Sequence, residues 1–124
     1  MTVKNFPLGA AVVLLPILIA GQRTATTTAV VRMKLPFAAK LEGVSVSARA
    51  SGGTTPTLTV DVLDDGTSVL STPVAVTAGA NADAVMDSTK QQIADESSIT
   101  VNLAITGTSP TWDDITVLLT LVRI

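Results

Sequence analysis

The densest group of acidic side chains is formed by Asp61, Asp64 and Asp65, in the segment DVLDDG. Ca2+ prefers oxygen ligands from a short flexible loop, and this loop could supply two or three of them. The segment lacks the twelve-residue pattern of an EF-hand, whereas Asp-Asp-Gly is a common hairpin turn in which glycine adopts a positive φ. The sequence therefore allows an ion-binding loop but favours a solvated turn.

Two further acidic pairs, Asp95-Glu96 and Asp113-Asp114, raise the question of catalysis, because two carboxylates can hydrolyse a glycosidic bond. Such sites usually carry aromatic platforms for the sugar, and the chain has one tryptophan and no tyrosine. It also has no cysteine and no histidine, which excludes disulfides, thiolate nucleophiles, imidazole bases and the usual zinc sites. We expect no enzyme, and we assign no catalytic, cofactor-binding or metal-binding residue.

Charge is sparse and unevenly distributed along the chain. Charged residues make up 15% of the sequence, and the formal net charge is −2. Five of the eight basic residues lie between residues 23 and 49, whereas nine of the ten acidic residues follow residue 60. This polarity either orients subunits or reflects ordinary solvated strand faces. Nucleic-acid binding is not expected, because no aromatic residues are interleaved with the basic ones.

The elements that would have to position these side chains are strands. The sequence contains 19 threonines, 16 valines and 7 isoleucines, which are β-branched residues that suit sheets. Apolar and polar residues alternate in segments 31–35, 44–50, 58–62, 99–105 and 115–121. No long amphipathic helix separates these segments, which argues against a parallel α/β sheet. We expect an all-β fold: an antiparallel, jelly-roll-like β-sandwich with an extended apolar N-terminal arm or strand.

Several local features interrupt the alternation. Leu41 and Val44 cannot both face inward in a regular strand, so a β-bulge is predicted at Glu42-Gly43. Segments 51–56 and 107–114 are predicted as loops, and residues 78–98 as a long surface excursion with one helical turn near 87–94.

The two predicted loops share a pattern, since Gly53–Thr57 reads GTTPT and Gly107–Thr111 reads GTSPT. One interpretation is convergent turn chemistry. The other is two hairpins whose loops lie together at one end of the sandwich and form a contact surface.

The most apolar segment is Leu8–Gly21, LGAAVVLLPILIAG. It is shorter than the ~20 residues that a membrane-spanning helix needs, and Pro16 interrupts it. A signal peptide over residues 1–21 is an alternative, although Gly21-Gln22-Arg23 is a poor cleavage site. We favour a strand or arm buried on both faces, with Pro16 at an edge or bulge. The predicted organisation is an N-terminal apolar arm or strand over 1–27 and a β-sandwich domain over 28–124.

Contacts with other chains are expected at apolar positions that a small sandwich cannot bury by itself. The strand at Ile115–Ile124 has a second, largely apolar face, so it is either central or packed against another chain. The only tryptophan either caps the sandwich or anchors an interface. The candidate interface residues are Val12, Leu14, Leu15, Ile17, Leu18, Ile19, Trp112, Leu118 and Val122.

Four segments in the last three quarters of the chain carry a family resemblance. They are LPFAAKLEGVSVSARA, SGGTTPTLTVDVLDDGTSVLSTPV, ADESSITVNLAITGTSP and ITVLLTLVRI. Together, residues 35–124 resemble the small β-sandwich of tailed-bacteriophage virion proteins, of the capsid decoration or cement type. Part of the pattern is general to β-sandwiches, and the N-terminal apolar segment is not part of it.

The resemblance implies a structural virion protein, above all a capsid decoration protein that oligomerises on the head lattice, with a trimer favoured. Its partners would be the major capsid protein and further copies of itself, with no nucleic acid and no membrane. It would be made in the host cytoplasm and end on the capsid surface. The alternatives are a tail, neck or fibre component, or a secreted β-sandwich binding module whose first ~20 residues are a signal peptide.

Overall fold

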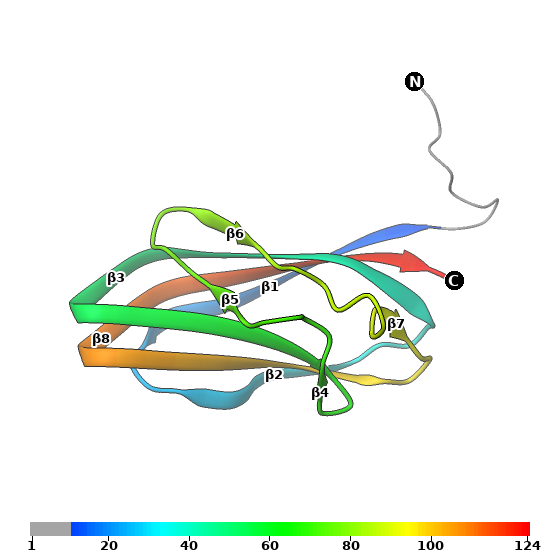
Figure 1. Cartoon of the computed structure of the whole chain (residues 1–124), viewed down its shortest axis with the longest axis horizontal. Helices are drawn as coiled ribbons and strands as arrows, with labels where there is room; N and C mark the ends of the chain where they lie inside the picture. Colours follow the sequence, from blue (N-terminus) through cyan, green and yellow to red (C-terminus); the bar gives the residue numbers. More distant parts are fainter. Residues whose placement is uncertain (1–10) are drawn as a thin grey trace, which may run out of the picture.

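The computed structural model describes residues 11–124, and this part of the chain is built from strands joined by turns (Figure 1). It contains no helix, and so none that could span a membrane. The strands are β1 (Val12–Arg23), β2 (Thr27–Lys34), β3 (Ala39–Asp64), β4 (Thr67–Ser68), β5 (Val74–Ala75), β6 (Asn81–Asp83), β7 (Gln92–Ile93) and β8 (Ser98–Arg123).

Two strands of 26 residues, β3 and β8, form the frame of the molecule. They pair antiparallel from Ala39 opposite Arg123 to Asp64 opposite Ile99. The ribbon folds over near its middle, so its two halves lie in opposite layers (Figure 1). One layer has the order β1-β8-β3-β6 and the other the order β2-β8-β3-β5. The predicted all-β antiparallel sandwich is confirmed, and this strand order fits a jelly-roll arrangement.

The core lies between the two layers and follows the predicted alternation. The bend divides β3 and β8 into two halves each. Because successive strand residues point to opposite faces of a sheet, alternate residues in each half are buried. The inward rows of β3 and β8 are Val44, Val46, Ala48, Leu58, Val60, Val62, Ile99, Val101, Leu103, Ile105, Ile115, Val117, Leu119 and Leu121. The register shifts between Leu41 and Gly43, which confirms the predicted bulge and lets Leu41 and Val44 both face inward. Residues 64–66 form a tight turn into β4, and Gly66 has a positive φ as predicted; Asp65 has a positive φ as well.

Other predictions on connecting segments were wrong. Segments 51–56 and 107–114 are not free loops but the bent middle of the β3/β8 ribbon, paired with each other. Residues 87–94 form no helical turn. Asp87 accepts hydrogen bonds from the backbone N–H and hydroxyl of Thr89, which closes a turn, and β7 then pairs with the start of β3. A side chain that bonds its own backbone in this way competes with helix formation.

Strand β1 belongs to the sandwich, because it pairs with β8 from Val12 opposite Val122 to Arg23 opposite Trp112. Ile17 and Ile19 of β1 are buried in the common core. Only one face of the strand is buried within this chain, not both as predicted. The described part of the predicted N-terminal segment is therefore an edge strand, and residues 1–10 lie outside the described residues.

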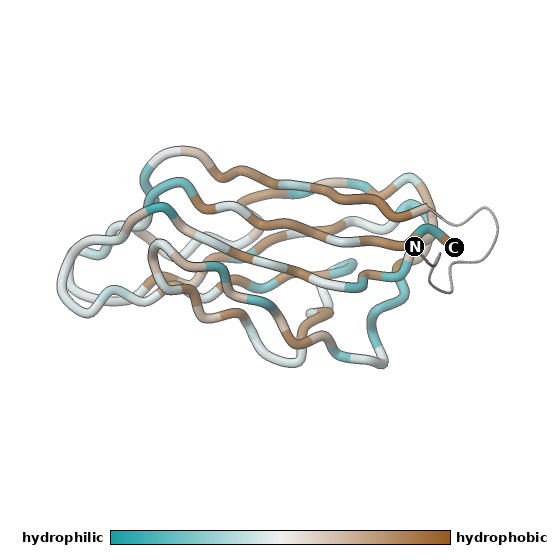
Figure 2. The backbone as a smooth tube through the Cα atoms, turned by 90° about the horizontal axis from the view of Figure 1, so that it is seen from above, coloured by the Kyte–Doolittle hydropathy of each residue, from teal (hydrophilic) through white to brown (hydrophobic). Residues whose placement is uncertain are grey.

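The two GT(T/S)PT segments meet at the end of the molecule opposite the C-terminus, and they are its palest part in Figure 2. Thr54 lies opposite Thr108, and Gly53 and Gly107 both have positive φ. A Cβ on Gly53 would lie 2.7 Å from the carbonyl oxygen of Thr108, and one on Gly107 would lie 2.9 Å from that of Thr55. The repeat therefore marks a nearly two-fold symmetric crossing of two strands, not two hairpin loops.

We expect Gly53→Ala to reduce the free energy of unfolding by about 3 kcal/mol, because it adds a clash with backbone oxygens to the strain of positive φ. Gly79→Ala is the matched control, since Gly79 has a φ of +77° but nothing within 4 Å of a new Cβ. This control should cost only about 1 kcal/mol. If urea unfolding shows that the two variants lose the same free energy of unfolding, the strands do not approach each other closely at Gly53.

Candidate interaction surface

The outward row of β1 is apolar and open to solvent. Inward-facing Ile17 and Ile19 are 8% and 6% exposed, whereas Val12, Leu14 and Leu18 on the other face are 48%, 61% and 64% exposed. Large apolar side chains exposed singly are ordinary, but a contiguous row of them marks an interaction site.

The neighbouring strand β8 widens this row. Val122 lies opposite Val12, and Leu118 lies opposite Pro16; both are half-buried and share the outward parity of the β1 row. We call the outward side chains of Val12, Leu14, Pro16, Leu18, Leu118 and Val122 the β1 face. Thr116 and Thr120 lie between them, so no charged residue interrupts the surface. From Val12 to Leu18 the face extends about 20 Å along β1.

The free edge of β1 differs from its face. Arg123 donates its backbone N–H to Ala11, 2.9 Å away, so the odd-numbered residues of β1 bond to β8. The even-numbered residues therefore direct their backbone groups to the open edge. Pro16 is one of these, so it leaves a gap among the donors there. Proline on an edge strand hinders pairing with a further strand. The face is thus better suited to contact than the edge.

The structure divides the nine candidate interface residues into two groups. Val12, Leu14, Leu18, Leu118 and Val122 lie on the β1 face. Ile17, Ile19 and Trp112 are buried in the core of the same chain, and Leu15 is half-buried against that core.

The assignment of these last four residues to an interface therefore needs correction. In a run of consecutive apolar residues, the sequence does not show which alternate row faces inward. Trp112, 2% exposed, fills the core near the bend of the ribbon.

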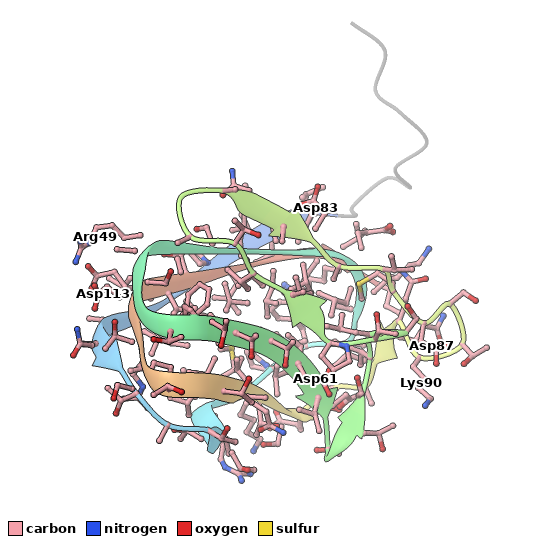
Figure 3. The ribbon with its side chains drawn as sticks, turned by 60° about the vertical axis from the view of Figure 1, so that its left-hand side comes forward. Arg49, Asp61, Asp83, Asp87, Lys90 and Asp113 are labelled. Atoms are coloured by element: carbon pink, nitrogen blue, oxygen red, sulfur yellow. The ribbon has the colours of Figure 1, made fainter. Side chains whose placement is uncertain are left out.

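The predicted acidic turn uses its carboxylates locally. Asp61 accepts a hydrogen bond from the Ser68 hydroxyl at 2.6 Å, and Asp65 accepts one from the backbone N–H of Ser98 at 2.9 Å. Burial raises the pKa of Asp64 above its ordinary value. Within residues 11–124, no three acidic side chains are grouped as a metal site would require. Figure 3 shows the labelled carboxylates of Asp61, Asp83, Asp87 and Asp113 spread over the molecule.

A shallow groove of about 450 Å3 lies on the outer surface of the other layer, over β2 and β8. It is lined by Arg32, Ser98, Thr100 and Asn102, among others. The β2 backbone lifts away from β8 here, and Ala29 donates its N–H to the side-chain oxygen of Asn102 at 2.7 Å. The side chain of Asn102 thus pairs with a backbone donor that the bulge in β2 turns away from the β8 backbone. The groove carries no pairing of a nucleophile with a base.

At the end of the β1 face nearest the bend lies a group of charged side chains. Arg49 donates from Nε to Asp114 at 2.8 Å, and its guanidinium lies 3.8 Å from Asp113 (Figure 3 labels Arg49 and Asp113). Asp114 also accepts the backbone N–H of Gly21 at 2.9 Å, where the register of β1 shifts. The hydrogen bond from Arg49, the positive charge of Arg49 and the N–H of Gly21 all lower the pKa of Asp114. This group fastens the end of β1 to the sheet.

Comparison with known proteins identifies no family. No protein-family model matches the chain. No curated protein matches it either. Among solved structures, a chain from "Structure of infectious bursal disease virus Gx strain" is similar over 92% of this chain, at 14% sequence identity and a TM-score of 0.37. This chain spans about a third of that one, 36% of its length. A likeness this weak carries no argument about function.

The Arg49–Asp114 pair predicts a specific dependence of stability on pH. Because the pKa of Asp114 is lower in the folded chain, its contribution is present above the ordinary aspartate pKa of about 3.9 and is lost as pH falls through the folded-state value. Asp114→Asn should therefore lower Tm at pH 7. It should also show a smaller fall of Tm than the wild type as the pH drops below 4.

The matched control is Asp83→Asn, which changes an exposed carboxylate on β6 that lies away from Arg49 (Figure 3). It should leave the Tm profile between pH 2 and pH 7 unchanged in shape. If Asp114→Asn gives the same profile as Asp83→Asn, the pair does not stabilise the fold.

Proposed function

We propose that the protein is a structural component of a bacteriophage virion, and specifically a capsid decoration protein that binds the major capsid protein and oligomerises on the head. The observation that carries the proposal is the β1 face, an uncharged apolar surface on a small sandwich. Such a surface favours assembly over chemistry. The resemblance of residues 35–124 to tailed-bacteriophage decoration proteins is the reason for proposing the phage head as that assembly.

The polar groups give independent support for a role without catalysis. The described carboxylates that make contacts hold turns, bulges and strand ends, as Asp61, Asp65, Asp87 and Asp114 do. A catalytic site would need a nucleophile paired with a base at a cavity, and the groove over β2 and β8 carries no such pair. We therefore propose that the protein is not an enzyme and acts by contact alone.

The secreted binding module is less well supported. Removing residues 1–21 as a signal peptide would take Ile17 and Ile19 out of the core. It would also leave β8 without its partner from Val12 to Ile19. The same reasoning shows that deleting residues 1–21 is a poor test of attachment, because it would damage the fold. Point substitutions on the outward row of β1 are better suited to the test.

We expect the purified protein to bind capsids of its source phage that lack it, to saturate at a fixed number of copies per capsid, and to raise the temperature at which those capsids open. Co-sedimentation and differential scanning fluorimetry of the capsids measure the two effects. Mature tails of the same phage serve as the comparison surface. Binding to tails but not to heads would replace the decoration role with that of a tail component. Binding to neither would overturn the virion proposal.

A further inference from the structure

We propose that the β1 face packs against the β1 face of a second copy of this chain, so that equivalent faces meet around the rotation axis of a homo-oligomer. This inference rests on the proposed function, because it assigns one surface to self-assembly and leaves the remaining surfaces for the virion. It names the residues of the contact and the way in which two copies approach each other.

Most of the exposed apolar side chains lie on the β1 face. In residues 11–124, the large hydrophobic residues that remain exposed are Val12, Leu14, Leu18, Val85 and Ile124. The first three lie on the β1 face. Ile124 is two residues beyond Val122, so it lies on the same side of the sheet at the end of the β1 face. Only Val85 lies elsewhere. A head-to-tail contact needs two different complementary patches, whereas a symmetric contact needs one patch that fits itself.

The β1 face also lacks the charges that would oppose a contact between equivalent surfaces. Around a rotation axis, a residue meets its own equivalent or a close neighbour, so a charged side chain at the centre would be repelled by itself. The β1 face has no charge from Val12 to Leu18, nor on the neighbouring residues Thr116 to Val122 of β8. Among residues 11–124, the nearest charges lie toward its ends: Lys40, which lies opposite Val122 and pairs with Glu42, and Arg49, which pairs with Asp114. An apolar centre with a polar rim is the usual anatomy of an interface.

Pro16 favours a face-to-face contact over an edge-to-edge one. Edge pairing would join β1 to β1 of the second copy by backbone hydrogen bonds. Pro16 removes a donor from the middle of that edge in both copies. Packing through the face needs no backbone donor.

Paired charge substitutions test the contact. We expect the wild-type protein to form an oligomer by native mass spectrometry, and both L14E/L18E and L14K/L18K to associate at least about tenfold more weakly. Mixing the two variants should restore an oligomer that contains both chains, because opposite charges then face each other. Val85→Glu is the matched control, since Val85 is 68% exposed but off the β1 face, and it should assemble like the wild type. Circular dichroism melts establish that each variant is folded.

A folded L14E/L18E variant that assembles like the wild type would overturn the inference, as would a wild-type protein that stays monomeric. Capsid co-sedimentation of the same proteins separates this result from the fate of the proposed function. A monomeric wild type whose capsid binding is lost in L14E/L18E would show that the face contacts the capsid, which refutes self-packing and keeps the virion role. A face-dependent oligomer that binds no virion part would keep self-packing and refute the virion role.

Discussion

The antiparallel pairing of β3 with β8 is the constraint on which the rest of the structure depends. One continuous ribbon supplies the two central strands of both layers, so the two layers cannot form separately. The ribbon must fold over for its apolar rows to face each other across the core. At the crossing, the backbones at Gly53 and Gly107 approach the opposite strand too closely for any side chain. Glycine is therefore required at these two positions for the strands to approach each other this closely.

The position of each remaining strand follows from that ribbon. β8 has β3 on one side, which leaves its other side to β1 in one layer and β2 in the other. β1 is consequently an edge strand with one row of side chains in the core and one row outside. Its inward row completes the sandwich, while nothing in residues 11–124 covers its outward row. Pro16 weakens the edge without interrupting the pairing with β8, so this strand limits association to its face.

Sequence reasoning was sufficient where local chemistry determines structure. The alternation from Ile99 to Ile105 gave the inward rows, the mismatch of Leu41 with Val44 gave the bulge, and Asp-Asp-Gly gave the turn. It was insufficient where distant pairing decides. The glycines and prolines of GTTPT and GTSPT are turn residues locally, yet the two segments pair with each other across more than fifty residues. The apolar run of β1 likewise did not reveal that Leu14 and Leu18 face outward while Ile17 and Ile19 face inward.

The absence of cysteine makes the central claim, that the outward row of β1 is an assembly surface, directly measurable. A single cysteine placed at Leu18 gives a chain whose only possible disulfide joins two copies. The account predicts that mild oxidation of Leu18→Cys yields a covalent dimer at micromolar protein concentration, whereas Val85→Cys, equally exposed but off the face, stays monomeric on a denaturing gel. Equal cross-linking at both positions, or cross-linking at Val85 alone, would contradict it.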